Sequence, residues 1–429
     1  MGKWLAGCGL VHLALIAALA AGACWGQAGG ERPGEPPGEK AIVRVVLWGY
    51  GFPGEMELYQ DALASFNRKH AEAEARLSYD AWTNAYAGTR NWLRQTEEAA
   101  YVILLRDEWL PEFAPALVPL EDVLAKDEFD SYYSCALDRC RYGGQTYGLP
   151  WTARTKALYY RADLFREAGL KPPQTWDELI AAAEKVASPP RLYGFGLPAA
   201  ESEESAELFL LLLWAQGGDL VRPNGKWEMG PEVVRTLELY SRLANVGHAT
   251  QPETTTWFQG DLQALFAIGR LGMVISDHSL ADFLDRNTQF RSLQYGIAPL
   301  PGGEQAITQV SADMLAISAG SRRQDLAVAL LRHLTRDSFL SALGEAGGLP
   351  GKRAAAEHSA SPRMRPFLAG LKAARGKPMA IWPEARGPIL QLIYEVLTGR
   401  KLPEDALRDM AAQGVPVALP PKPEGPAPR

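Results

Sequence analysis

The chain has 429 residues, a length that corresponds to about two or three domains. Apolar residues make up 47% and charged residues 22%, a balance typical of globular proteins, which argues against global disorder, collagen-like repeats and a multi-span membrane protein. Lys and Arg number 44 and Asp and Glu number 50, so the net charge is −6, and a chain with this charge and no basic block is a poor candidate for binding nucleic acid.

The N-terminus has the pattern of a secretory signal. Lys3 precedes an apolar stretch over residues 10–23, which is too short to span a bilayer as a helix. The stretch ends in Ala21-Gly22-Ala23 before Cys24, and small residues before a Cys resemble the lipobox of bacterial lipoproteins, although Ala21 stands where that motif usually has Leu. We therefore expect a signal peptide over residues 1–23 and lipidation at Cys24. Ordinary cleavage after Ala23 is the alternative.

Two more terminal segments have compositions that do not support a packed core. Residues 25–40 are rich in Gly, Pro and Glu, so residues 24–40 are expected to form a lipid-anchored linker. Residues 415–429 contain six Pro and are expected to be a disordered tail. The fold is therefore expected within residues 41–414.

The four cysteines are consistent with export. Cys8 leaves with the signal and lipidation occupies Cys24, so Cys135 and Cys140 remain as a possible disulfide in an oxidising compartment. Two free thiols are the alternative. The sequence has neither a CxxC motif nor the spacing of zinc ligands, so we expect no metal and no cofactor.

The N-terminal part of the expected fold alternates between strands and helices. Apolar runs predict buried strands at residues 42–48 and 101–105, and a further strand is expected at residues 76–80. Apolar residues at helical spacing predict a helix over residues 55–70, and a polar helix is expected over residues 86–98. This order predicts a mainly parallel sheet covered by helices, with ligands beyond the carboxyl ends of the strands. The candidate binding segments are residues 48–55, 80–84 and 106–109.

The rest of the chain indicates a second unit that begins near residue 158. Thr175 and Glu178 form a capping box that starts a helix ending at residues 188–190. From residue 362 to 412 we expect helices only. The other expected elements are helices over residues 208–215, 231–247, 258–269 and 324–336, and strands over residues 272–276 and 314–318.

Motifs of the common hydrolases and nucleotide-binding enzymes are missing from the sequence. No HExxH, GxSxG or GxxxxGK[ST] motif is present. Asp107 and Glu108 are candidates for acid–base work on a glycoside. Adjacent residues at a strand end point in different directions, however, so the chain is predicted not to be an enzyme.

The high number of tryptophans is the feature of the composition that points to a function. Ten of the twelve Trp residues lie beyond residue 40. A pyranose ring has an apolar face that packs on an aromatic ring and a rim of hydroxyls that bind charged and amide side chains. Loop Trp residues near charged groups therefore favour carbohydrate binding, and core packing is the alternative for each of them. Those at loops or element ends are Trp48, Trp82, Trp109, Trp151, Trp227, Trp257 and Trp382.

Several blocks, spread nearly from end to end of the chain, match the motifs of one known family. They are Tyr147-Gly148-Leu149-Pro150-Trp151, Leu158-Tyr159-Tyr160-Arg161, Asp163-Leu164-Phe165, Ala168-Gly169-Leu170, Thr175-Trp176-Asp177-Glu178-Leu179, Phe258-Gln259-Gly260, Gly272-Met273-Val274-Ile275-Ser276 and Ala298-Pro299-Leu300-Pro301-Gly302-Gly303. In these blocks the chain resembles the extracellular solute-binding proteins of bacterial ABC importers, the family of the maltose- and trehalose-type sugar receptors.

The resemblance implies an α/β periplasmic binding protein type II fold, with two lobes, hinge crossings and solute in the cleft between them. Lobe one is expected at residues 41–152 plus 302–346, and lobe two at residues 153–300 plus 347–414. The implied function is a receptor that captures a carbohydrate and delivers it to the transmembrane subunits of an ABC importer permease. We expect an exported monomer in the periplasm or on the outer face of the cytoplasmic membrane, attached to the membrane by its lipid anchor alone.

Nine residues are expected to bind the solute, with Trp rings stacking on sugar and charged groups binding its hydroxyls. Three departures from the family pattern, at Arg154, residues 276–278 and residues 310–313, leave the particular sugar open. Arg154 favours an anionic solute or clamps neutral hydroxyls, and a salt bridge between the lobes is the alternative. The nine expected residues are Trp48, Glu55, Asp107, Glu108, Trp151, Arg154, Trp257, Asp277 and Trp382.

The same residues leave other functions open. In the same fold, the solute is alternatively a glycerol phosphate or a polyamine. A cleft dominated by Arg favours the phosphate and one dominated by carboxylates favours the amine. A glycoside-acting enzyme and a sensor that no longer transports are the two further alternatives.

Overall fold

The computed structural model describes residues 40–49, 54–94, 100–245, 249–302 and 306–418. The expected signal peptide, the lipidation site Cys24 and all of the expected linker except Lys40 lie outside these residues. Within them, no helix combines the length and the apolar character that crossing a membrane requires.

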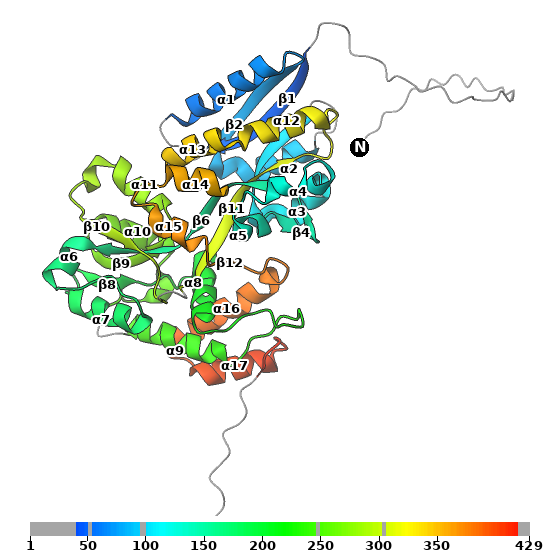
Figure 1. Cartoon of the computed structure of the whole chain (residues 1–429). Helices are drawn as coiled ribbons and strands as arrows, with labels where there is room; N and C mark the ends of the chain where they lie inside the picture. The colour runs from blue at the N-terminus through cyan, green and yellow to red at the C-terminus, as the bar shows by residue number, and fades with distance from the viewer. Residues whose placement is uncertain (1–39, 50–53, 95–99, 246–248, 303–305, 419–429) are drawn as a thin grey trace, which may run out of the picture. The chain divides into compact units, whose positions relative to one another are not determined.

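The first sheet contains the alternating strands and helices that the sequence predicts. Strands β1, β2 and β3 pair in parallel, with β1 in the middle. Helix α1 packs on β2 and on α12, and α12 also packs on β1 and β3 (Figure 1). The bounds are β1 Ala41–Gly49, α1 Glu55–Lys69, β2 Ala73–Ala81, α2 Ala85–Arg94, β3 Ala100–Arg106 and α12 Gln324–Leu334.

Three later strands complete this sheet. Strand β11 (Thr308–Ile317) pairs antiparallel with both β3 and β6 (Gly148–Thr155). Strand β12 (Ala374–Gly376) pairs in parallel with β11. The expectation of helices only after residue 362 is therefore wrong at β12. These three half-buried residues show no apolar alternation, and they pair through their backbone with the edge of β11.

The second sheet has the strand order β10-β7-β9-β8. Helix α7 packs on β8 and α10 packs on β9, whereas α8, α9, α16 and α17 pack on one another. Helix α8 is buried nearly all round, as its sequence predicts. The bounds are β7 Ala157–Arg161, α7 Trp176–Val186, β8 Tyr193–Gly196, α8 Glu203–Ala215, α9 Glu232–Asn245, α10 Gln259–Ala267, β9 Leu271–Ser276, β10 Tyr295–Ala298, α16 Trp382–Leu397 and α17 Pro403–Ala412.

Short elements connect and flank the two sheets. A small antiparallel pair joins β4 (Arg141–Tyr142) to β5 (Gln145–Thr146). The remaining α-helices are α3 Leu110–Phe113, α4 Lys126–Phe129, α5 Ser134–Asp138, α6 Ala162–Glu167, α11 Ser279–Arg286, α13 Asp337–Glu345, α14 Arg353–Ser359 and α15 Arg365–Gly370.

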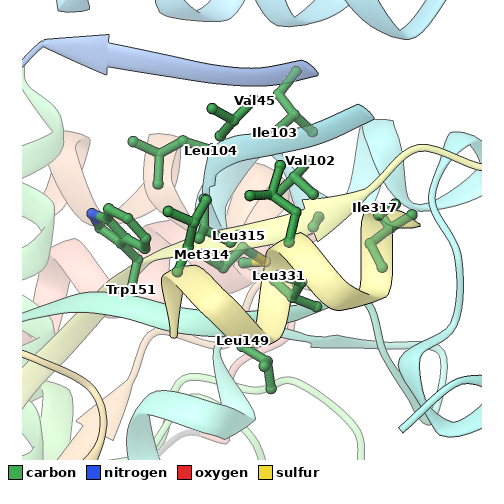
Figure 2. Packing of buried hydrophobic residues seen from close by; sticks show 14 of the residues in the cluster. Val45, Val102, Ile103, Leu104, Leu149, Trp151, Met314, Leu315, Ile317 and Leu331 are labelled. Atoms are coloured by element: carbon green, nitrogen blue, oxygen red, sulfur yellow. The ribbon is translucent and has the colours of Figure 1, made fainter. Parts of the chain in front are cut away.

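Each sheet packs on a large apolar cluster, a third cluster contains residues of both sheets, and the chain first crosses from one sheet to the other at Lys156. Figure 2 shows part of the first core, where Trp151 of β6 lies beside Met314 of β11 and Leu104 of β3. Strand β6 continues into β7 through Lys156. The backbone N–H of Lys156 donates to Thr308 Oγ1 (3.0 Å), and the Thr308 hydroxyl donates to the Lys156 carbonyl (2.8 Å). This Thr therefore fixes the start of β11 to the crossing point.

The segment expected to be a tail is partly ordered. The Met229 N–H donates to the Pro416 carbonyl (2.8 Å), and the Ala418 N–H donates to the Met229 carbonyl (2.9 Å). Val415 and Val417 pack against the core of the second sheet. The expectation of disorder is therefore wrong for residues 415–418.

Cys135 and Cys140 are free thiols, so the possible disulfide is not formed. Their sulfur atoms have separate partners, because Cys135 Sγ donates to the Leu371 carbonyl (3.0 Å) and Cys140 Sγ donates to the Ala136 carbonyl (3.6 Å). Burial raises the pKa of the Cys135 thiol to about 11, which keeps it protonated and unreactive at neutral pH.

Close packing of α7 on β8 makes Gly194 a sensitive position. A Cβ atom at Gly194 would lie 2.0 Å from the backbone carbonyl oxygen of Ala183 in α7. We expect Gly194→Ala to lower the free energy of unfolding by about 3 kcal/mol, because the helix must move to relieve the overlap. Gly387→Ala in α16 is the matched control, since its Cβ would meet no atom within 4 Å. Urea denaturation of both variants tests this, and equal stabilities would contradict it.

Candidate functional site

A charged cavity of about 410 Å³ lies where the two sheets meet. Apart from Gly260, every residue that lines it is polar or charged. These residues come from the ends of strands in both sheets and from the first two turns of α8 and α10. We call this the charged cavity; its lining residues are Arg106, Glu108, Arg154, Lys156, Glu203, Glu204, Glu207, Gln259, Gly260, Gln263, Asp277, Gln309, Ser311 and Lys377.

Two ion pairs form part of the wall of this cavity. Arg106 Nε lies 3.3 Å from Glu108 Oε1, just beyond the carboxyl end of β3. Lys156 Nζ lies 3.8 Å from Asp277 Oδ2, which follows β9. Burial alone would raise the pKa of Asp277, but the nearby charge of Lys156 lowers it well below its ordinary value, so this carboxylate is ionised.

A third ion pair lies within the first sheet. The Arg154 guanidinium on β6 donates two hydrogen bonds to Asp313 on β11, at 2.5 Å to Oδ2 and 3.0 Å to Oδ1. The Asp313 side chain is 0% exposed, and it also accepts a hydrogen bond from the Thr152 hydroxyl (3.2 Å). Arg154 therefore forms a salt bridge, the alternative given for it, and its partner lies on the neighbouring strand of the same sheet.

A buried ammonium group and three carboxylates form a further charge cluster in the wall of the cavity. Lys377 Nζ lies 2.5 Å from Glu203 Oε1, 2.9 Å from Glu207 Oε1 and 3.6 Å from Glu108 Oε2. The two glutamates of α8 are four residues apart and therefore on one face of that helix. Burial alone would lower the pKa of Lys377, but Glu207 and Glu203 raise it, so this side chain carries its charge at neutral pH.

A second cavity of about 570 Å³ adjoins the first, because both are lined by Arg106 and Arg154. It brings aromatic side chains to the site. The Trp82 ring stacks on Trp109 at 6.0 Å between ring centres, and Phe283 of α11 is 46% exposed. We call this the aromatic cavity; its lining residues are Trp82, Arg106, Thr152, Arg154, His278, Ser279, Asp282, Phe283, Arg286, Asn287, Leu343, Gly347 and Gly348.

Three of the nine expected residues line the charged cavity, namely Glu108, Arg154 and Asp277. Two more lie directly behind its wall. Asp107 is buried and forms an ion pair with Arg139 (2.7 Å), and Trp382 Nε1 donates to Glu203 Oε1 (2.7 Å). Strand ends and the crossover therefore bring together five of the nine, although only three face the open volume.

The other four expected residues do not line either cavity. Trp48 and Trp151 are packed in the core of the first sheet, and Trp48 Nε1 donates to the Leu104 carbonyl (2.9 Å). Glu55 is buried beneath two tyrosine hydroxyls, with Tyr59 at 2.9 Å and Tyr79 at 3.0 Å. Trp257 Nε1 donates to the Pro252 carbonyl (2.9 Å). For Trp48 and Trp151, core packing rather than a ligand is therefore the correct interpretation.

Several residues that line or adjoin the cavities could not be singled out from the sequence pattern. Lys377 follows β12, a strand that no apolar pattern revealed. Glu203 and Glu207 carried a weak signal, because two glutamates four residues apart precede a wholly apolar run. Trp82 was among the loop Trp residues but was not chosen, and Phe283 had no signal beyond its place in a helix.

Asp282 gives the aromatic cavity a pH dependence. Burial, with a smaller effect of Asp285 and Asp277, raises the pKa of Asp282 from 3.8 to about 6, although Arg286 at 3.2 Å acts in the opposite direction. Between about pH 4 and pH 6 the folded protein therefore holds a proton that the unfolded chain has released. The contribution of Asp282 to stability is thus largest below this window and is lost as the pH rises through it.

We expect Asp282→Asn to raise the melting temperature at about pH 7.5 and to leave it unchanged near pH 4. An amide cannot ionise, so the variant avoids the cost of a buried charge at the higher pH. Thermal melts of wild type and variant across this range measure the effect. Asp405→Asn, at an exposed carboxylate that pairs with Arg408 on α17, is the control. An Asp282→Asn curve parallel to that of the wild type would contradict the prediction.

Comparison with known proteins identifies the family. The profile of the bacterial extracellular solute-binding protein family matches residues 57–338. A Brucella abortus protein named as a binding protein is 28% identical over 323 residues, covering 72% of this chain and 77% of that protein. The diacetylchitobiose binding protein DasA of Streptomyces coelicolor is 24% identical over 373 residues, covering 83% and 85%. The maltose-bound MalE3 structure of T. maritima superposes with a TM-score of 0.70 and 24% identity over 87% of this chain and 98% of that one.

These findings agree with the structure at two levels. The likeness to MalE3 confirms the two-lobed α/β fold of periplasmic binding proteins that the sequence predicts. The family profile covers more than half of the chain and includes β2, β3, β6 and β11 of the first sheet and all four strands of the second sheet. The chain therefore belongs to the bacterial extracellular solute-binding protein family.

Proposed function

We propose that this protein is the carbohydrate receptor of an ABC importer and that it binds its solute across the charged and aromatic cavities. One observation carries the proposal. Two adjoining cavities share Arg106 and Arg154, and one of them offers charged hydrogen-bonding groups whereas the other offers the rings of Trp82 and Phe283. A sugar requires both, because its C–H face packs on aromatic rings while its hydroxyls bind charged side chains.

Named relatives support a carbohydrate over other polar solutes. DasA is named for diacetylchitobiose, and MalE3 was determined with maltose, and both of these ligands are neutral sugars. The cations of the charged cavity are paired with carboxylates, as Arg154 is with Asp313 and Lys156 is with Asp277. This pairing leaves less charge for a phosphate than a cavity of unpaired cations would.

Within this function, the proposed binding residues differ in part from the expected set. Glu108, Arg154 and Asp277 would bind hydroxyl groups, and Trp82 and Phe283 would stack on sugar rings. The glycoside-acting alternative relied on Asp107 and Glu108, and Asp107 is held by Arg139 outside the lining of both cavities. We therefore propose a receptor and not an enzyme.

Transport would follow from the two-lobed fold. A solute that contacts both lobes favours the closed conformation by its higher affinity for that state. The transmembrane subunits of the permease would recognise the closed form. The protein would act as an exported monomer, held at the membrane by the lipid anchor expected at Cys24, and its family is extracellular.

A thermal-shift screen of the purified mature protein tests the proposal. The compounds are neutral mono- and oligosaccharides, sugar phosphates and polyamines. Because a ligand that binds only the folded state raises the melting temperature, we expect a rise with a neutral saccharide. A rise with phosphates or polyamines alone would replace the carbohydrate by that class, and no rise with any compound would contradict an uptake receptor.

A further inference from the structure

The ammonium group of Lys377 occupies the part of the charged cavity that is lined by glutamates. Lys377 is 4% exposed, and its Nζ atom lies among the carboxylates of Glu203, Glu207 and Glu108. These carboxylates come from α8 of the second sheet and from the end of β3 in the first. Several carboxylates around one small volume can bind an organic ammonium ion through charge-assisted hydrogen bonds.

The backbone around Lys377 holds the side chain in this position. Lys377 directly follows β12, whose pairing with β11 fixes the segment to the first sheet. Arg139 Nη1 donates to the Lys377 carbonyl (2.8 Å) while its Nε binds Asp107 (2.7 Å). The Trp382 ring lies beside the ammonium, with 5.6 Å between Nζ and the ring centre. The ammonium is therefore built into the wall of the cavity and is not a mobile surface group.

The carboxylates around Lys377 are themselves held in place by other groups. Glu203 accepts from Trp382 Nε1 (2.7 Å) and forms an ion pair with Arg386 (2.9 Å). Glu207 is largely buried. Burial alone would raise its pKa, but Lys377 and then Lys156 lower it, so Glu207 stays ionised. Removal of the Lys377 ammonium would therefore leave an ordered set of carboxylates around a vacant position.

We propose that Lys377 is a specificity residue, an internal ammonium that fills the amine position of the cavity and so excludes cationic solutes in favour of neutral hydroxyl-bearing ones. The inference rests on the proposed function in one respect, because it takes the charged cavity to be the solute site. It gives a physical reason for the choice between a carbohydrate and a polyamine. The glutamates that would bind an amine already hold the ammonium group of Lys377.

Chemical replacement of the missing side chain tests the proposal. Lys377→Ala removes three methylene groups and the amine, which together correspond to n-propylammonium. We expect this variant to bind n-propylammonium at least about tenfold more tightly than the wild type, and to gain a rise of about 3 °C in melting temperature at saturating amine. Isothermal titration and thermal melts measure both, with n-propanol as the uncharged control ligand. Lys372→Ala, at an exposed lysine outside the cavity, is the matched control variant.

A second variant keeps the test decisive if Lys377→Ala does not fold. The wild-type cluster has three carboxylates and one ammonium, a net charge of −3 + 1 = −2. Glu203→Gln with Lys377→Ala has two carboxylates and no ammonium, which is also −2. This double variant should fold and still bind n-propylammonium more tightly than the wild type. Failure of both variants to fold, with or without amine, would make Lys377 a folding residue and overturn the proposal.

The remaining outcomes separate this inference from the proposed function. A folded variant that binds n-propylammonium no better than the wild type would overturn the role of Lys377, whatever the carbohydrate screen shows. A gain of amine binding in a protein that binds no saccharide would support the role of Lys377 and count against the carbohydrate receptor. Equal binding of polyamines by wild type and Lys377→Ala would also overturn the inference.

Discussion

Replacing Arg154 with Met should lower the free energy of unfolding by about 3–5 kcal/mol. The Arg154 guanidinium binds both carboxylate oxygens of Asp313, and the Asp313 side chain is 0% exposed. The variant removes this cation and leaves the carboxylate inside the sheet, where loss of the partner charge is costly. Urea denaturation followed by tryptophan fluorescence measures the change.

Two further variants identify the cause of this loss. Arg154→Met combined with Asp313→Leu removes both charges and should regain most of the lost stability, because a buried pair replaced by apolar side chains is often neutral. Arg161→Met is the matched control, since Arg161 pairs with Asp163 at 2.6 Å where both side chains keep some contact with solvent. We expect a smaller loss there. Equal losses in Arg154→Met and Arg161→Met would show that the burial of Asp313 is not the cause.

The fold was predictable where local pattern determines the element. The apolar runs of β1 and β3 and the helical spacing in α1 depend on neighbouring residues alone, and the structure confirms these elements within a few residues. Strand β12 was not predictable in this way. It exists because β11 offers it a backbone edge, and its own side chains are half-buried without alternation. A strand that is determined by its pairing partner need not show the alternation of apolar and polar residues by which strands are predicted.

The candidate site, like the fold, was predictable only in part. The strand-end pattern pointed to Glu108, and the resemblance to the family pointed to Arg154 and Asp277; all three line one cavity. The side on which a Trp ring lies was not predictable. Trp48 ends a strand and turns inward because α2 presents Gly88 to it, so that a Cβ atom there would lie 2.3 Å from the ring. Because such a contact joins residues that are distant in the sequence, the local sequence pattern does not predict it.

Replacing Trp151 and Trp82 with Ala should have opposite effects on stability and on saccharide binding. Trp151 is 0% exposed and packs at 5.2 Å from Phe339 and 6.3 Å from Tyr59, measured between ring centres, within the core shown in Figure 2. Trp151→Ala should therefore lower the free energy of unfolding by about 3–5 kcal/mol, through lost burial and the cavity left behind. Where the variant remains folded, its affinity for the solute should match that of the wild type.

Trp82→Ala should show the reverse pattern. Its ring is only partly buried and lines the aromatic cavity, so its removal should weaken saccharide binding by at least about tenfold, which corresponds to about 1.4 kcal/mol of lost stacking. The cost in unfolding free energy should be smaller than for Trp151→Ala, because the ring leaves solvent-accessible volume rather than a closed void. Titration with the saccharide found by thermal shift and urea denaturation of both variants give the two quantities. A loss of affinity in Trp151→Ala without one in Trp82→Ala would move the stacking surface to the ring that the sequence first suggested.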